Sequence, residues 1–132
     1  MSRTTSMIFV VALLLPIGCL AKDMHNMYRN ISPTGYESCS DFVAANDECN
    51  DGVCMRFAVF RVWLQGYLTS YNLMEPDTYD IAGGKGRDTA DKTLEIWLAK
   101  YCAQNSSKSF AEAAEALTIE YYPTRLKTMP KE

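Results

Sequence analysis

Histidine is almost absent from this sequence, which has only His25 among its 132 residues. His25 lies in the polar stretch KDMHNMYRN near the beginning, where an unanchored chain end is expected to be solvated. The chain therefore has little of the side chain that most often moves protons near neutral pH. Since the sequence also lacks a nucleophile beside a base or a recognisable pair of catalytic carboxylates, we predict that the protein is not an enzyme.

Recognisable metal and phosphate motifs are also missing. The cysteines do not form two close CxxC pairs, the spacing typical of zinc sites. Asp77, Asp80 and Asp88 surround a loop and could hold calcium, but they lack the alternate spacing and the final glutamate of an EF-hand. The stretch GGKGR, residues 83–87, has neither phosphate-loop spacing nor a preceding strand. We therefore expect no metal and no cofactor, and interpret residues 83–87 as part of a flexible surface loop.

Only one long apolar run is present, at residues 7–15. It follows the positive charge of Arg3 and precedes Cys19 and Ala21, small residues at the third-last and last positions of a signal-peptidase site. We interpret residues 1–21 as a signal peptide, and the remainder as secreted. The run is too short to span a bilayer, and no later segment is long and apolar enough to do so.

Two covalent modifications are alternatives that the sequence leaves open. Gly18 and Cys19 could end a lipobox, with Cys19 retained and lipidated, although Pro16 stands where an aliphatic residue is usual. The triplets NIS at 30–32 and NSS at 105–107 fit the glycosylation sequon, which matters only in a eukaryotic secretory pathway.

Positive charge is neither abundant nor clustered. The chain has 13 Lys and Arg against 16 Asp and Glu, and removing the signal peptide with Arg3 changes the net charge from -3 to -4. Scattered cations do not make the basic patch that nucleic-acid binding requires. The remaining length suits one small domain with a modest core.

Four of the five cysteines remain after the signal peptide, an even number in an oxidising compartment. Cys49 and Cys54 flank an Asp-Gly turn signal that could bring their sulfurs together. This leaves Cys39 at an early helix for Cys102 at the end of a late one. Spacing favours these two disulfides, while other pairings, such as Cys39 with Cys54, stay open because connectivity cannot be deduced from sequence.

Apolar periodicity and turn residues predict an all-α fold, a small disulfide-linked bundle of about four helices. The predicted helices cover residues 39–46, 53–72, 89 or 90 to 103, and 110 to about 122. The expected N-terminal caps are Ser38 with Asp41, Asp88 or Thr89, and Ser109 with Glu112. The predicted organisation is a signal peptide (1–21), a flexible segment (22–36), a helical domain (37–123) and a C-terminal tail (124–132).

The second predicted helix is apolar on two sides. Phe57, Leu64 and Leu68 recur at helical spacing and suit the core, whereas Val59 and Val62 point towards another face. Glycine within this helix suggests a close helix crossing or a bend. One small core covers one face, so we predict that a dimer partner or a client protein covers the other. The candidate residues are Val59, Val62, Trp63, Leu64, Gly66 and Tyr67.

Three stretches carry a family resemblance: SCSDF at 38–42, WLQGYLTSYN at 63–72, and YCAQN with SFAEAAEAL within 101–117. Together they resemble the HdeA/HdeB family of small periplasmic acid-stress chaperones, which implies a helical fold and a periplasmic location. The resemblance also implies a disulfide between the early helix and the YC motif. The extra pair Cys49 and Cys54, a serine at 106 where relatives usually have proline, and a longer loop depart from the pattern.

Two functions follow as expectations. The resemblance implies a dimeric holdase that acid loosens, so that its apolar faces bind unfolding client proteins. The alternative is a periplasmic binding protein, like the immunity proteins that neutralise toxins delivered by type VI secretion, because the added disulfide and longer loop suit one specific partner.

Overall fold

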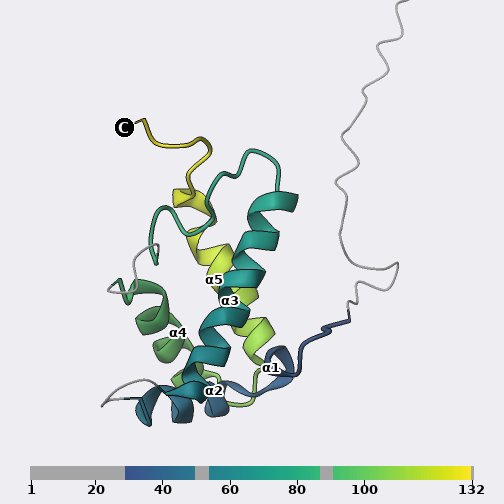
Figure 1. The fold of residues 1–132 in the computed structure, drawn as a ribbon, viewed down its shortest axis with the longest axis vertical. Coiled ribbons are helices and arrows are strands. Elements are labelled where there is room, and N and C mark those ends of the chain that lie inside the picture. Colours follow the sequence, from purple (N-terminus) through teal and green to yellow (C-terminus); the bar gives the residue numbers. More distant parts are fainter. Residues whose placement is uncertain (1–28, 50–53, 87–90, 132) are drawn as a thin grey trace, which may run out of the picture.

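The computed structural model describes residues 29–49, 54–86 and 91–131, whose arrangement is shown in Figure 1. These residues contain five α-helices and a short 3-10 helix, and no strand beyond two isolated bridges. The elements are α1 (Pro33–Tyr36), α2 (Cys39–Asp47), α3 (Met55–Met74), α4 (Thr93–Gln104), α5 (Phe110–Tyr121) and η1 (Tyr122–Thr124). The predicted all-α bundle is confirmed, with α1 and α2 at one end of the long helix α3 (Figure 1).

Helices α2 and α5 begin with the capping boxes that the sequence predicts. The Ser38 hydroxyl accepts a hydrogen bond from the Asp41 backbone N–H at 3.2 Å, and the Asp41 carboxylate accepts one from the Ser38 N–H at 3.0 Å. Ser109 and Glu112 repeat this exchange at 3.2 and 2.8 Å. Each box satisfies N–H groups that have no partner within the helix, and so fixes where the helix starts.

Helix α4 begins at Thr93, a few residues later than predicted. The predicted caps Asp88 and Thr89 lie outside the described residues. The Asp91 carboxylate instead accepts hydrogen bonds from the backbone N–H of Gly86 at 2.8 Å and of Thr93 at 2.9 Å. Asp91 thereby links the preceding loop to the first turn of the helix.

Three phenylalanines from different helices form the centre of the core. Phe42 of α2, Phe60 of α3 and Phe110 of α5 have ring centroids 4.8 to 5.5 Å apart. All three are at most 1% exposed. Aromatic rings at these separations gain stability beyond the burial of their area, so this cluster holds the three helices together.

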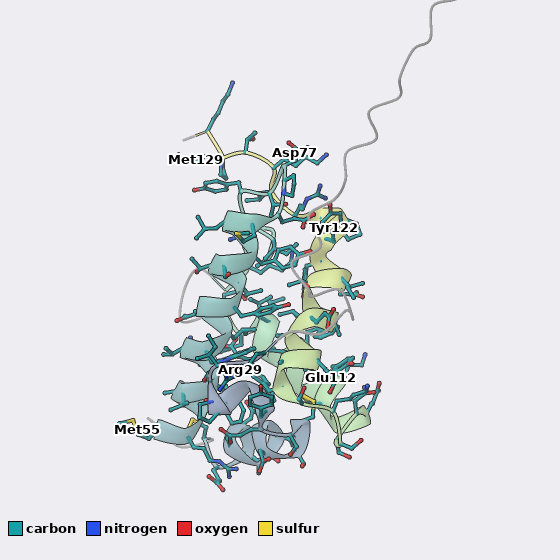
Figure 2. The ribbon with its side chains drawn as sticks, turned by 90° about the vertical axis from the view of Figure 1, so that its right-hand side faces the viewer. Arg29, Met55, Asp77, Glu112, Tyr122 and Met129 are labelled. Carbon is teal, nitrogen blue, oxygen red and sulfur yellow. A yellow bond between two sulfur atoms is a disulfide. The ribbon has the colours of Figure 1, made fainter. Side chains whose placement is uncertain are left out.

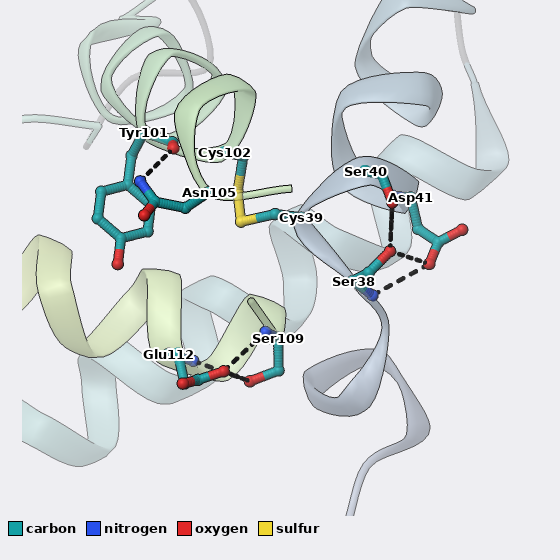
Figure 3. Close-up of a disulfide and its surroundings, with 9 residues drawn as sticks. All are labelled: Ser38, Cys39, Ser40, Asp41, Tyr101, Cys102, Asn105, Ser109 and Glu112. Carbon is teal, nitrogen blue, oxygen red and sulfur yellow. Dashed lines mark hydrogen bonds between the residues drawn. A yellow bond between two sulfur atoms is a disulfide. The ribbon is translucent and has the colours of Figure 1, made fainter. Parts of the chain in front are cut away.

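Both predicted disulfides are present. Cys39 at the start of α2 is bonded to Cys102 near the end of α4, with Cα atoms 4.7 Å apart and both residues fully buried (Figure 3). Cys49 is bonded to Cys54 just before α3, with Cα atoms 5.3 Å apart. The alternative pairing of Cys39 with Cys54 therefore does not occur.

The packed domain extends past residues 37–123 at both ends. Helix α1 lies in the segment for which the sequence predicts a flexible chain, yet Thr34 and Gly35 are buried. At the other end, the backbone of Leu126 forms an antiparallel bridge with Asp80. Short helices and single bridges have weak sequence signals, which is why periodicity misses both contacts.

The predicted signal peptide, Cys19 and His25 lie outside the described residues. Among the helices that the structure does describe, none has the length and apolar character needed to cross a membrane.

Candidate functional site

Helix α3 has an apolar surface on the side that faces away from the bundle. Six residues at alternating steps of four and three positions form this α3 stripe: Met55, Val59, Val62, Gly66, Thr69 and Leu73. All six are exposed. Figure 2 shows α3 at one edge of the bundle, with Met55 pointing away from the other helices. The α3 stripe is therefore open to a partner along the whole helix.

The opposite face of α3 is the one that packs into the core. Phe60 is 1% and Leu64 5% exposed, whereas Val62 is 67% and both Met55 and Leu73 are 79% exposed. An outward helix face normally carries charged side chains, but the α3 stripe has none. The hydroxyl of its one polar residue, Thr69, donates to the helix's own Gln65 carbonyl at 2.7 Å. Such an apolar surface is typical of a protein-binding site.

The structure places most of the predicted binding residues on or beside this stripe. Val59, Val62 and Gly66 belong to it, and Trp63 and Tyr67 lie half-buried next to it. Leu64 does not belong to this surface, because its side chain packs in the core cluster.

The sequence suggests that Gly66 permits a close helix crossing. The structure shows no such crossing at Gly66 within a single chain. Apart from its two chain neighbours and the nearby backbone of α3 itself, a Cβ atom built on Gly66 would have no atom within 4 Å. Glycine within an exposed helix is less favourable than alanine, so packing within one chain does not explain this residue.

Trp63 lies in a slot formed by three elements. Its ring stacks on Tyr67 with centroids 5.5 Å apart and lies 5.5 Å from the ring of Phe110. A Cβ on Gly35 of α1 would fall 2.8 Å from the indole, so glycine is needed for α1 to approach this closely. A groove of about 450 Å³ runs beside the indole and along Val59. Trp63 thus forms one wall of a cleft next to the α3 stripe.

Sequence reasoning missed the two ends of the stripe. Met55, Thr69 and Leu73 continue the spacing of Val59 and Val62 in both directions. The signal was the regular spacing itself, which extends over the whole of α3. The interaction surface is therefore longer than the predicted face.

The glycine-rich loop uses its N–H groups internally. The Asp80 carboxylate accepts hydrogen bonds from the backbone N–H of Ala82 at 3.0 Å and of Gly84 at 2.9 Å. The N–H of Gly86 donates to Asp91. These groups are the ones a phosphate would need, so the loop's geometry does not favour a phosphate site.

The hydrogen bonds of Asp80 also concern the alternative that Asp77, Asp80 and Asp88 hold calcium. The two oxygens of Asp80 already accept N–H groups, and Asp88 lies outside the described residues. Within the part of the chain that the structure describes, no three His, Cys, Asp or Glu side chains are grouped to hold a metal.

Residues 75–86 form an anchored segment that packs on the C-terminal chain. Ile81 is fully buried, and its N–H donates to the Asn72 side chain at 2.8 Å. Arg125 donates to the Thr78 hydroxyl at 3.1 Å. A groove of about 380 Å³, lined by Arg61, Gln65, Asn72, Tyr79, Lys85 and Glu95 among others, lies between this segment and α3 and α4. It is a second, more polar surface that a partner could recognise.

Both sequon asparagines use their side chains for structure. The side-chain amide nitrogen of Asn30 is buried close to Gly35. The side-chain oxygen of Asn30 accepts a hydrogen bond from the Ser32 N–H at 3.1 Å. The Asn105 amide donates to the Tyr101 carbonyl at 2.8 Å, beside the buried disulfide (Figure 3). A glycan would displace these contacts, so neither position suits glycosylation in the folded protein.

The starts of α2 and α5 lie side by side near the buried disulfide. The Cys39 N–H donates to the Lys108 carbonyl at 2.7 Å, and the Phe110 N–H donates to the Glu37 carbonyl at 2.8 Å. Figure 3 shows both capping boxes around this junction. The first turns of two helices therefore depend on one set of local contacts.

Both capping carboxylates have lowered pKa values. A hydrogen bond from the Lys108 ammonium, followed by one from the Ser109 backbone N–H, holds the pKa of Glu112 at about 2. Hydrogen bonds from the hydroxyl and the backbone N–H of Ser38 lower the pKa of Asp41. The junction is therefore sensitive to acid, because protonation removes the charged acceptor in each box.

We expect the Glu112→Gln variant to be less stable than the wild type at neutral pH. We also expect it to lose less stability than the wild type when the pH is lowered. The pKa of Glu112 in the folded protein, about 2, is below its ordinary value of 4.5. The ionised group thus contributes stability that is complete above the ordinary value and is lost as the pH falls through about 2. The effect is modest because the Glu112 side chain is 43% exposed and screened by solvent.

Urea unfolding at pH 7 and in steps from about pH 5 to about pH 2 measures this difference. Glu120→Gln is the control, since it removes a carboxylate from the last turn of the same helix. Identical pH dependence in Glu112→Gln and the wild type would refute the role of this cap.

Comparisons with protein-family models, with curated proteins and with solved structures find no match for this chain. Its function is therefore inferred from the surfaces described above.

Proposed function

We propose that this protein is a secreted, non-enzymatic holdase-type chaperone of the periplasm, and that its α3 stripe binds unfolding clients. The observation that carries the proposal is the α3 stripe, whose six exposed residues from Met55 to Leu73 include no charged side chain. Unfolding proteins expose apolar side chains, and these gain stability by covering such a surface. The stripe offers apolar area with few directional hydrogen bonds, which suits clients of varied sequence.

Acid supplies the trigger in this proposal. Aspartate and glutamate protonate as the pH falls below about 4, while lysine and arginine stay charged. The net charge then changes from mildly negative to strongly positive, and self-repulsion opposes both association and compact packing. The acid-sensitive caps of α2 and α5 are expected to weaken in the same direction.

The disulfide between Cys39 and Cys102 limits how far the chain can open. It joins α2 to α4 across 63 residues of sequence and lies in the core. A loosened protein would thus keep these two helices together and regain its fold when the pH returns to neutral.

The test is light scattering by an aggregating client at about pH 2.5 and about pH 7, with and without this protein. We expect suppression of aggregation in acid by the wild type. Val62→Lys is expected to abolish it, because lysine stays charged in acid and lies in the centre of the stripe. The matched control is Ile119→Lys on α5, since Ile119 is 69% exposed and Val62 67%.

If the Val62→Lys and Ile119→Lys variants suppress client aggregation equally, the α3 stripe is not the surface that binds clients. If the wild type leaves client aggregation unchanged in acid, the chaperone proposal fails.

A second candidate is a binding protein for one secreted partner, such as a toxin that the protein neutralises. The observation that favours it is the anchored segment 75–86, whose polar groove offers directional contacts for one partner. Inhibition of a secreted hydrolase encoded by a neighbouring gene would support this function, and no effect on that enzyme would oppose it.

A further inference from the structure

We propose that the Cys49–Cys54 disulfide is a site of thiol–disulfide exchange, at which this protein reversibly captures a cysteine in an extended apolar polypeptide segment. The site uses a different face of α3 from the α3 stripe. Exchange requires a thiolate, which forms near neutral pH and not in acid. This activity is therefore separate from the acid-induced function proposed above.

The two disulfides differ in how closely a thiol can approach them. Cys39 and Cys102 are both 0% exposed. Cys49 and Cys54 are half-buried, and both line a groove of about 630 Å³. Exchange begins when a thiolate attacks a sulfur atom of the disulfide, so access decides which bond reacts. The Cys49–Cys54 bond is therefore the reactive one.

The groove beside this bond suits an apolar chain segment. It runs between α3 and α4, and no Cα atom of one of these described helices lies within 8 Å of a Cα atom of the other. Phe57 and Ala58 line it from α3, and Ile96 and Ala99 line it from α4. Ile96 is 67% exposed, and a bound segment would cover it. The volume lies within the usual range for ligand sites.

The two sulfur atoms lie at helix ends of opposite polarity. Cys49 follows the C-terminal end of α2, whereas Cys54 is the N-cap residue of α3. The N-terminal end of a helix stabilises a thiolate, and the C-terminal end does not. Since exchange is faster when the departing sulfur is the better-stabilised thiolate, attack occurs at Cys49 and Cys54 departs.

The surrounding charges leave this asymmetry in place. The charged side chains that line the groove or join the first turn of α3 to its neighbours are Arg61, Lys92 and Glu95, and Arg56 with its partners Asp41 and Glu48. Cations and carboxylates are equal in number among them. Neither sign dominates beside the bond, so the helix ends decide which sulfur departs.

The exchange step balances without an added oxidant. The incoming thiolate sulfur forms a bond to Cys49 Sγ, and the bond between Cys49 Sγ and Cys54 Sγ breaks. Cys54 leaves with the electron pair as a thiolate and takes a proton from water. Attack of the Cys54 thiolate on Cys49 then reforms the original disulfide and releases the captured polypeptide with its thiol restored.

The first experiment tests which bond reacts. The secreted protein with both disulfides formed is incubated with reduced glutathione at about pH 8, quenched with acid, alkylated and mapped by mass spectrometry. We expect glutathione on Cys49 and an alkylated Cys54, with the Cys39–Cys102 bond intact. In urea the buried bond should react as well. Absence of an adduct, or an adduct mainly on Cys54, Cys39 or Cys102, would overturn the proposal.

The second experiment tests the asymmetry of the two sulfurs. Cys49→Ala leaves the Cys54 thiol, and Cys54→Ala leaves the Cys49 thiol. We expect the pKa of the Cys54 thiol to be about one unit lower than that of the Cys49 thiol, measured from thiolate absorbance against pH. A lower pKa at Cys49 would reverse the direction of attack and contradict the mechanism.

The third experiment tests the groove with two synthetic peptides, one with its cysteine between leucines and one with its cysteine between serines. We expect the leucine peptide to form the mixed disulfide about tenfold faster, because its side chains are buried in the groove. Ala99→Trp, which fills the groove, should remove this advantage. Ala103→Trp, at an exposed position on the same helix, should keep it. Equal rates for the two peptides with the wild type would reject the groove as the docking site.

The outcomes separate this proposal from the proposed function. Exchange at neutral pH without protection of clients in acid would retain the exchange site and reject the chaperone. Protection in acid by a protein whose Cys49–Cys54 bond resists glutathione would retain the chaperone and reject the exchange site.

Discussion

Replacing both Cys39 and Cys102 with alanine is expected to lower the free energy of unfolding by about 4 kcal/mol. The bond closes a loop between residues that are 63 positions apart, and it therefore removes many conformations from the unfolded chain. A small domain has a total stability of about 5 to 15 kcal/mol, so the loss is a large part of the total. In acid, the same variant is expected to lose any protective activity because α2 and α4 can separate.

The matched control removes the other disulfide. Cys49→Ala with Cys54→Ala opens a bond between residues only five positions apart, and is expected to cost about 2 kcal/mol. Urea unfolding of both double variants at neutral pH gives the comparison. A larger loss from the Cys49 and Cys54 variant would contradict the assignment of the main structural role to the buried bond.

Phe110→Ala is expected to cost about 3 to 5 kcal/mol. The Phe110 ring is fully buried, lies 5.0 Å from Phe42 and 4.8 Å from Phe60, and contacts Trp63. Its removal leaves a cavity where α2, α3 and α5 meet and withdraws support from Trp63. Tryptophan fluorescence should therefore change along with the unfolding midpoint.

Phe110→Leu is the control because it restores most of the lost volume. It should recover more than half of the lost stability, since volume-conserving apolar exchanges in a core usually cost less than about 1.5 kcal/mol. Equal losses in the two variants would indicate that ring contacts, rather than cavity volume, set the effect.

Several structural features could be predicted from the sequence because their causes are local. Ser38 with Asp41 and Ser109 with Glu112 are three residues apart, and so their capping boxes follow from spacing alone. Cys49 and Cys54 lie on either side of a turn signal, which brings them together within a few residues. Such signals do not depend on how distant parts of the chain pack.

Other features depend on contacts between distant segments. Asp91 was not predicted as an acceptor for Gly86, and the late start of α4 could not be read from its apolar pattern. The bridge between Asp80 and Leu126 joins residues far apart in sequence through backbone atoms. Backbone pairing does not depend strongly on side-chain identity. The sequence therefore predicted a loop and a tail where the structure has an anchored segment.

The candidate site shows the same division. The sequence by itself determined that α3 is apolar on two sides, because the helical repeat fixes which residues share a face. Only the tertiary structure decided that Leu64 faces the core while Val62 faces solvent, since Phe42 and Phe110 come from other helices to cover one side of α3. The open space at Gly66 was likewise a matter of tertiary structure, because a helical pattern does not reveal whether another segment packs against the helix.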